Sequence, residues 1–157
     1  QNIVMNNVRT SHNTFLPKSH KVVKDIYEKL SNIINIDEDH FEQLQVVRYK
    51  PGQLYKAHWD ACWEKDKCHD FMKKGDNRYA TFLLYLNDDF TGGETYFPLI
   101  NKKIIPEKGK AALFFNLDKD NINKLENSKH AGLPPTSGVK WMCNVWVRLN
   151  KIPIQYQ

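Results

Sequence analysis

A single amphipathic segment followed by many short β-type segments constrains the fold of this chain more than any other sequence feature. Apolar residues recur at helical spacing over residues 22–34, with charged residues between them, and Ser19 is a candidate N-cap. After residue 43, runs rich in β-branched and aromatic residues are separated by turns that contain Gly, Pro or Asn. The predicted strands cover residues 44–49, 54–60, 79–86, 94–97, 102–105, 111–117 and 140–149. This order predicts a mainly β (α+β) fold, a sandwich or jelly roll with one helix packed on the outer face of one sheet.

The length and composition fit one globular domain over residues 1–157, of which residues 1–18 form an extended lead-in. Hydrophobic residues make up 41% and charged residues 26%, which excludes a disordered tail, a collagen-like chain and a coiled coil. No run approaches the ~18 apolar residues that a membrane-spanning helix needs, so we expect a soluble protein without a membrane span. The net charge of +5 leaves nucleic acids, anionic surfaces and acidic ligands open as partners.

Two polar stretches, residues 61–77 and 118–129, are expected to be surface loops. The first contains Cys62 and Cys68, which either pair as a loop disulfide or remain free thiols. Cys143 lies in an apolar run and is expected to be a buried thiol. Three cysteines are too few for a disulfide scaffold, so the hydrophobic core must hold the fold together.

A candidate metal site begins with His58 and Asp60 in a predicted strand. Side chains alternate along a strand, so residues two apart lie on the same face and present an imidazole beside a carboxylate. His130, just before a Gly- and Pro-rich turn, is the candidate for the third ligand. Two histidines and one carboxylate on one face of a metal are typical of non-haem Fe(II) oxygenases, because the other positions stay open. The remaining histidines are expected on the surface: His12, His20, His40 and His69.

The last predicted strand carries a second candidate, Lys140. By alternation one of its faces carries Lys140, Met142, Asn144, Trp146 and Arg148. The opposite face, which we expect to be apolar core, carries Trp141, Cys143, Val145 and Val147. A buried lysine needs an anionic partner, and the carboxylate of an acidic co-substrate would serve. The alternative is a lysine at a strand end that reaches solvent.

Several sequence blocks, in order along nearly the whole chain, carry a family resemblance. They are Arg9-Thr10-Ser11, residues 48–60 (RYKPGQLYKAHWD), Arg78-Tyr79-Ala80-Thr81, residues 85–88 (YLND), residues 92–98 (GGETYFP), residues 108–115 (KGKAALFF), residues 130–135 (HAGLPP), residues 138–141 (GVKW) and Trp146-Val147-Arg148. Together they resemble the prolyl 4-hydroxylase family of 2-oxoglutarate- and Fe(II)-dependent dioxygenases. The resemblance implies a double-stranded β-helix, a jelly-roll variant, with helices on one side. It also places residues 61–77 where the family has a mobile cover over the substrate groove.

The resemblance further implies a reaction and a set of residue roles. The expected enzyme, similar to procollagen-proline 4-dioxygenase, uses O₂, Fe(II), 2-oxoglutarate and ascorbate to hydroxylate peptidyl proline at C4, releasing succinate and CO₂. The implied metal ligands are His58, Asp60 and His130. The implied co-substrate residues are Lys140, which would pair with the distal carboxylate of 2-oxoglutarate, Tyr49 and Thr95. The implied substrate-binding residues are Tyr55, Arg78 and Trp146, and the expected partner is an extended, polyproline II-like peptide.

Some of these roles have structural alternatives. Tyr55 is an odd number of residues from His58, so it points to the other face unless a bulge re-aims it. Tyr49 is otherwise a half-buried residue of a sheet, and Arg78 a surface residue at a strand start. The chain lacks the opening strand and helix that precede Arg9-Thr10-Ser11 in the family. We therefore expect a trimmed or short form, whose compartment and oligomeric state the sequence leaves open.

Two other functions stay open. The same iron chemistry could act on another side chain or on a nucleic-acid base. The lysines and arginines are scattered rather than gathered in a basic helix, which makes nucleic acid an unfavoured partner. In the other alternative, the protein is a non-catalytic jelly-roll module that binds peptides.

Overall fold

The computed structural model describes residues 8–64 and 67–156. The start of the predicted lead-in, two residues of the 61–77 loop and residue 157 lie outside the described residues. The helices and strands are β1 (His12–Leu16), α1 (Lys21–Ile34), β2 (Leu44–Tyr49), β3 (Tyr55–His58), α2 (His69–Met72), β4 (Arg78–Tyr85), β5 (Thr91–Gly92), β6 (Thr95–Phe97), β7 (Lys102–Ile104), β8 (Ala111–Phe115), β9 (His130–Gly132), β10 (Pro135–Ser137) and β11 (Lys140–Arg148).

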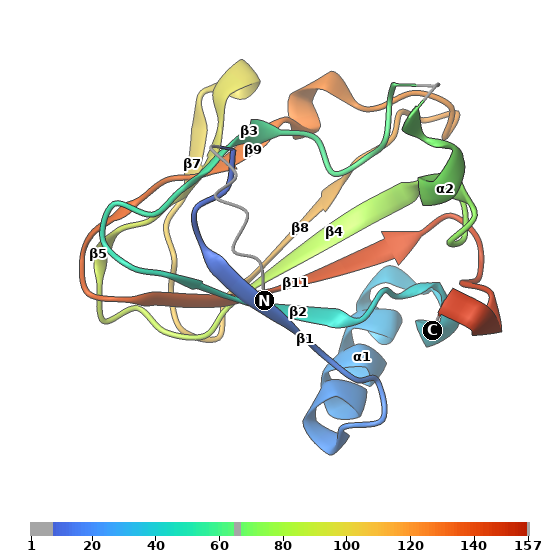
Figure 1. Ribbon diagram of the computed structural model, residues 1–157, viewed down its shortest axis with the longest axis horizontal. Helices are drawn as coiled ribbons and strands as arrows, with labels where there is room; N and C mark the ends of the chain where they lie inside the picture. The colour runs from blue at the N-terminus through green and yellow to red at the C-terminus, as the bar shows by residue number, and fades with distance from the viewer. Residues whose placement is uncertain (1–7, 65–66, 157) are drawn as a thin grey trace.

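The strands form an antiparallel five-stranded sheet in the order β1-β2-β11-β4-β8 and a four-stranded sheet in the order β3-β9-β6-β7. A two-stranded ribbon pairs β5 with β10. Helix α1 lies on one side of the larger sheet and the smaller sheet lies on the other (Figure 1). This arrangement confirms the predicted jelly-roll architecture with a helix on the outer face of one sheet.

The amphipathic pattern of α1 produces the helix and its packing. Val23, Tyr27 and Leu30 recur at helical spacing, and all three are buried in a cluster with Phe82 and Val145 of the larger sheet. The faces of β11 divide as predicted in this region, because Val145 and its neighbours on that face pack under the helix. The first hydrophobic layer therefore lies between α1 and the outer face of the sheet.

The start of α1 corrects the predicted N-cap. His20, rather than Ser19, is the capping residue: its backbone is extended at φ −66° and ψ 131°, and its carbonyl oxygen accepts the first helical bond from the Lys24 N–H at 3.0 Å. The His20 side chain makes no capping hydrogen bond. The capping residue is therefore defined here by its backbone position, directly before the first helical residue. The capping preference of the Ser19 side chain does not decide it.

A second correction concerns Trp141, which we predicted to face the apolar core. Its side chain is 40% exposed, while Cys143 two residues later is 3% exposed. Trp141 lies opposite Arg48 of β2, whose guanidinium carbon is 5.8 Å from the indole centroid. Neither residue belongs to the cluster under α1, so the helix covers only part of this face.

A second hydrophobic layer lies between the two sheets. It contains Val47, Leu83, Tyr85 and Met142, which lie on the inner face of the larger sheet. Lys140, Asn144 and Arg148 belong to the same face of β11 and are also buried. The polar half of this layer is where the candidate site lies.

The two predicted loops contain short helical turns, α2 in one and a 3₁₀ helix η4 (Glu126–Ser128) in the other. Cys62 and Cys68 form a disulfide, which decides between the two alternatives left by the sequence. Cys143 is a buried free thiol, as predicted. Among the described residues, no helix combines the length and the apolar character needed to cross a membrane.

Candidate active site

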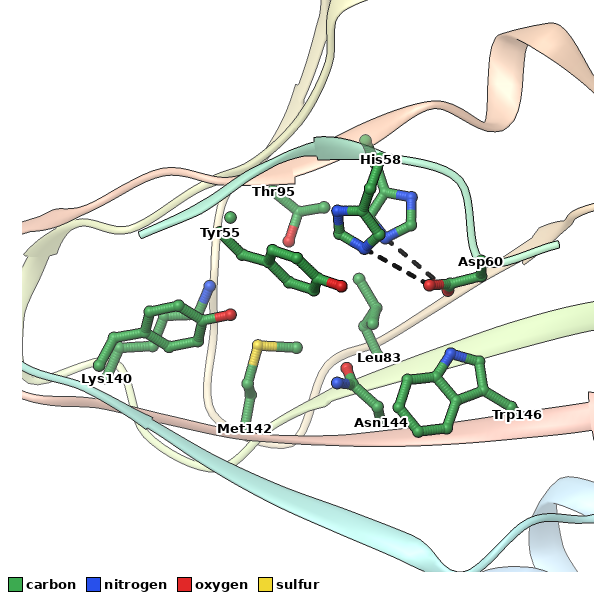
Figure 2. A pocket seen from close by; sticks show the side chains of 12 residues that line it. Tyr55, His58, Asp60, Leu83, Thr95, Lys140, Met142, Asn144 and Trp146 are labelled. Carbon is green, nitrogen blue, oxygen red and sulfur yellow. Dashed lines mark ion pairs between the residues drawn. The ribbon is translucent and has the colours of Figure 1, made fainter. Parts of the chain in front are cut away.

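The two histidines of the candidate metal site lie on neighbouring strands of the smaller sheet. His58 ends β3, His130 begins β9, and the two residues are directly opposite each other in the antiparallel ladder. Asp60 follows two residues after His58, in a bend past the end of β3. The Asp60 carboxylate oxygens lie 3.4 Å from His58 Nε2 and 3.8 Å from His130 Nε2 (Figure 2). The structure thus brings together the three predicted ligands, whose donor atoms all lie within 4.8 Å of one another.

Backbone hydrogen bonds set the tautomer of both imidazoles. His58 Nδ1 lies 2.8 Å from the Lys56 carbonyl oxygen, and His130 Nδ1 lies 2.9 Å from the Ser128 carbonyl oxygen. A carbonyl oxygen can only accept, so Nδ1 carries the proton in each ring and Nε2 keeps its lone pair. Both lone pairs then face the Asp60 carboxylate, as in a histidine ready to bind a metal.

Asp60 is held from the side opposite the histidines. The Thr81 hydroxyl of β4 donates to Asp60 Oδ2 at 2.7 Å and accepts from Asn116 Nδ2 at 2.8 Å. Burial opposes ionisation of Asp60, but the positive charges of protonated His130 and His58 and of Arg78 lower the pKa of its carboxyl below the ordinary value. Burial lowers the pKa of His130, so its imidazole is neutral and able to act as a ligand near pH 7.

This donor set fits Fe(II). Two neutral imidazole nitrogens and one carboxylate converge from one side, and the site lies between the two sheets rather than on an exposed acidic surface. Three protein ligands on one side leave other coordination positions for a co-substrate and O₂. A zinc site of the structural type would instead need a fourth protein ligand, and among the described residues the cluster holds three.

Lys140 lies deep in the same cavity, at the start of β11, and its side chain is fully buried. Its ammonium donates to the Gly93 carbonyl oxygen at 2.7 Å and, among the described residues, forms no ion pair. Burial lowers the pKa of Lys140 to about 8, and Glu94 opposes the shift. Gly93 has a φ of 71°, and a Cβ there would lie 2.9 Å from Phe90 Cε2, so this close approach requires glycine. The site therefore presents a buried cation with no carboxylate partner in residues 8–64 and 67–156.

Tyr49 and Thr95 lie around this cation. The Lys140 ammonium is 5.2 Å from the Tyr49 ring centroid and 5.5 Å from that of Tyr85. The Tyr85 hydroxyl and Thr95 Oγ1 are 2.7 Å apart, and both side chains are buried. Tyr49, Thr95 and Lys140 line the same cavity, so it offers hydroxyl groups and one ammonium, which suits a carboxylate.

Tyr55 lies inside the cavity because the strand is irregular. The register of β3 with β9 shifts between Tyr55 and His58. This irregularity turns Tyr55 to the same face as His58, whereas regular alternation would put it on the opposite face. Its ring stacks on the His58 imidazole, with centroids 3.6 Å apart and an interplanar angle of 19°. Figure 2 shows the ring between Lys140 and the triad. The cavity around it holds only about 30 Å³.

Arg78 and Trp146 lie on the other side of the triad and contact each other. The Arg78 guanidinium carbon is 3.7 Å from the Trp146 ring centroid, and two of its nitrogens donate to the Glu42 carboxylate at 2.7 and 2.8 Å. Arg148 shares the same carboxylate, with its Nε 2.7 Å from Glu42 Oε1. The surface alternative for Arg78 is therefore wrong. Among the described residues Trp146 Nε1, which is buried, has no hydrogen-bond acceptor.

A second cavity, of about 310 Å³, adjoins the site at Asp60. Its walls combine three aromatic residues, Trp59, Trp63 and Phe71, with charged residues that include Arg78 and Glu64. The Cys62–Cys68 disulfide closes the chain segment that carries Trp63.

Sequence reasoning missed four residues that hold the site: Glu42, Thr81, Tyr85 and Ser128. Thr81 and Tyr85 belong to blocks that carried the resemblance, but an isolated Thr or Tyr in a strand gives no sign of its partner. Ser128 acts through its backbone carbonyl, which no sequence pattern indicates. Glu42 lies 36 residues from Arg78 along the chain, and only the fold brings them together.

A family model described as the 2OG-Fe(II) oxygenase superfamily matches residues 44–148. A protein of Acanthamoeba polyphaga mimivirus, whose name assigns it provisionally to the prolyl 4-hydroxylases, is 43% identical over 147 residues, covering 92% of this chain and 60% of that protein. Prolyl 4-hydroxylase 1 of Arabidopsis thaliana is 34% identical over 161 residues, covering 92% of this chain and 55% of that protein. The chain thus spans little more than half the length of these relatives.

Among solved structures, the 2OG complex of viral collagen prolyl hydroxylase from Paramecium Bursaria Chlorella virus-1 is similar, with a TM-score of 0.76 and 36% identity. The match covers 89% of this chain and 79% of that chain. A prolyl-4-hydroxylase from Pseudomonas putida has a TM-score of 0.65 at 17% identity, covering 92% and 74% of the two chains, and supports the fold alone.

Proposed function

Because the chain belongs to the prolyl 4-hydroxylase family of the 2OG-Fe(II) oxygenase superfamily, we propose that it hydroxylates peptidyl proline at C4 with 2-oxoglutarate and O₂ as co-substrates. The observation that carries the proposal is that one cavity holds the His58–Asp60–His130 triad together with a buried Lys140, which forms no ion pair within the described part of the chain. A metal triad alone serves many reactions, whereas the added buried cation selects a dicarboxylate co-substrate.

In this proposal, His58, Asp60 and His130 hold Fe(II), and Lys140 binds the distal carboxylate of 2-oxoglutarate. Tyr49 and the Tyr85–Thr95 hydroxyl pair supply further hydrogen bonds at that end of the cavity. Fe(II) with 2-oxoglutarate and O₂ supplies the oxidative step, in which the co-substrate becomes succinate and CO₂ and one oxygen atom enters the substrate. The protein fixes the position of the reactants and keeps bulk water out.

Tyr55 occupies space in the cavity that the co-substrate would enter. Its ring stacks on the His58 imidazole with centroids 3.6 Å apart, beside a proposed metal ligand. In the view of Figure 2, the Tyr55 ring lies between Lys140 and the triad. We infer that it turns away from His58 when the co-substrate enters, and that it then faces the peptide.

The aromatic cavity beside Asp60 is the proposed peptide site. Proline-rich segments adopt the extended polyproline II form, which aromatic grooves bind well because little ordering entropy is lost. Trp146 Nε1 is a buried donor without an acceptor among the described residues, and a peptide carbonyl oxygen would satisfy it. Arg78, stacked on Trp146, is placed to donate its remaining N–H groups to the same peptide.

The test is to incubate the protein with a proline-rich peptide, Fe(II), 2-oxoglutarate and ascorbate, and to measure peptide mass and succinate. The proposal expects a gain of one oxygen atom on proline and an equal amount of succinate. It is refuted if no proline-containing peptide gains oxygen and no succinate forms. His58→Ala is the control: hydroxylation should disappear, and hydroxylation that persists would also refute the proposal. Loss of activity together with intact peptide binding separates the enzyme from a non-catalytic binding module.

A further inference from the structure

The backbone ladder between the two ligand-bearing strands stops at the metal site. His58 and His130 form the last pair of the β3–β9 ladder. Beyond that pair, the segment after β3 continues through Trp59 to Asp60. The segment before β9 comes from η4 through Lys129. Regular sheet hydrogen bonds therefore hold the two histidines together but do not extend to the third ligand.

Side chains replace the missing ladder at this point. Trp59 Nε1 donates to the Glu126 carbonyl oxygen at 3.2 Å. The ammonium groups of Lys124 and Lys129 lie 3.9 and 4.3 Å from the Trp59 ring centroid, within the range of cation–π attraction. Lys124 also forms an ion pair with the Glu126 carboxylate. We call these four residues (Trp59, Lys124, Glu126 and Lys129) the Trp59 bracket.

The Trp59 bracket is connected to all three ligands. Trp59 is the residue between His58 and Asp60, so its indole is attached to the backbone that carries both. Glu126 is the first residue of η4, and Ser128, the last, accepts the hydrogen bond that orients His130. The bracket thus joins the helical turn that orients one ligand to the backbone that carries the other two.

We propose that the Trp59 bracket is a positioning device that keeps Asp60 and His130 at the separation a metal ion requires. Ligands that are already in place bind a metal more tightly, because less ordering is needed on binding. Trp59 and the two lysines act on the metal through the ligand-bearing segments. Trp59 also lines the proposed peptide cavity, so metal binding is measured without peptide. This inference rests on the metal site of the proposed function, but not on which substrate is hydroxylated.

The experiment titrates Co(II) into the metal-free full chain under anaerobic conditions and follows its visible absorption, which reports affinity and ligand geometry. We expect Trp59→Leu to weaken Co(II) binding by roughly 10- to 100-fold, the range seen when groups that orient metal ligands are lost. Lys124→Met, which keeps the Trp59 ring and its hydrogen bond, should weaken binding several-fold and shift the spectrum. Lys124→Arg, which keeps a cation over the ring, should restore both.

Trp141→Leu is the matched control, because it removes an indole that is 40% exposed on the outer face of the sheet. It should leave Co(II) affinity unchanged, and thermal unfolding of each metal-free variant excludes loss of fold as the cause. If Trp59→Leu does not fold, Lys124→Met and its Arg counterpart decide. Parent-like Co(II) affinity and spectrum in the folded variants overturn the bracket alone. Absence of Co(II) binding by the parent protein, with His58→Ala as reference, overturns the metal site and the bracket with it.

Discussion

Replacing Lys140 by methionine should separate two opposite effects of one buried charge. In the ligand-free protein the ammonium is fully buried and has one neutral acceptor, the Gly93 carbonyl oxygen at 2.7 Å. The fall in the pKa of Lys140 from 10.5 to about 8 corresponds to about 3 kcal/mol of unfavourable free energy for the charged form. Methionine has a similar length and no charge, so it removes this cost.

The methionine variant loses the hydrogen bond to Gly93, which costs about 1 kcal/mol. The net expectation for Lys140→Met is a gain of ~2 kcal/mol in the free energy of unfolding of the ligand-free protein near pH 7. For a chain of this size, that raises the midpoint of thermal unfolding by roughly 4–8 °C. Urea and thermal unfolding of the two proteins, without metal or co-substrate, measure the difference.

Co-substrate binding should change in the opposite direction. A charged hydrogen bond made in a buried site contributes at least about 2 kcal/mol, so Lys140→Met should weaken 2-oxoglutarate binding by roughly 30-fold or more. Isothermal titration in the presence of Mn(II) gives this dissociation constant without turnover. Lys102→Met, on the exposed side of β7, is the control and should change neither quantity.

The pH dependence gives an independent check of the same reasoning. The folded protein has a lower pKa for Lys140 than the unfolded chain, so between pH 8 and 10.5 the unfolded state binds more protons. The parent protein should therefore gain stability as pH rises through this window, and Lys140→Met should lack that gain. Parent affinity for 2-oxoglutarate should fall above about pH 8, as the ammonium loses its proton. The reasoning is refuted if Lys140→Met is less stable than the parent protein, or if it binds 2-oxoglutarate within threefold of the parent.

Three other perturbations test the supports of the site. Thr81→Val keeps the shape of a buried side chain but removes the hydroxyl that donates to Asp60. Co(II) affinity should therefore fall by about 10- to 100-fold, and an unchanged affinity would contradict this. Glu42→Gln leaves two arginines without a carboxylate and should lower the free energy of unfolding by about 3 kcal/mol in urea titrations; a change below 1 kcal/mol would count against it. Reduction of the Cys62–Cys68 disulfide should lower the free energy of unfolding by about 2 kcal/mol, because the unfolded chain gains loop entropy. Unfolding with and without a thiol reductant measures this difference. Cys68→Ser is the control and should not respond to the reductant.

The sequence was sufficient to predict the overall fold because its main determinants are local. Apolar spacing predicted α1, and the strand and turn signals predicted β2, β3, β4, β6, β7, β8 and β11 to within a few residues. Strands β5, β9 and β10 went undetected, because each has two or three residues that include Gly or Pro and so resemble a turn. Residues 12–16 were assigned to the lead-in, although β1 forms there, because their pairing with β2 is a long-range contact.

The candidate site shows the same division. Strand alternation placed His58 and Asp60 together, and they do converge, although Asp60 lies in a bend past the strand rather than within it. His130 was a candidate from its place before a Gly- and Pro-rich turn, and the family resemblance supported that choice. Its place opposite His58 depends on pairing across more than 70 residues. The sequence left undecided whether a bulge turns Tyr55 into the cavity, because no local pattern distinguishes a bulged strand from a regular one.

The central position of β11 in the larger sheet has a consequence for folding of the protein during its synthesis on the ribosome. β2 and β4 lie on either side of β11, and neither has its full set of neighbours until residues 140–148 have been made. Until then, the emerging chain exposes two apolar strands with open edges, which are templates for association with other chains. Chaperone dependence during synthesis should therefore be greatest just before β11 emerges. A chain terminated ahead of Lys140 would be an aggregation-prone fragment, because it lacks the strand that closes the sheet.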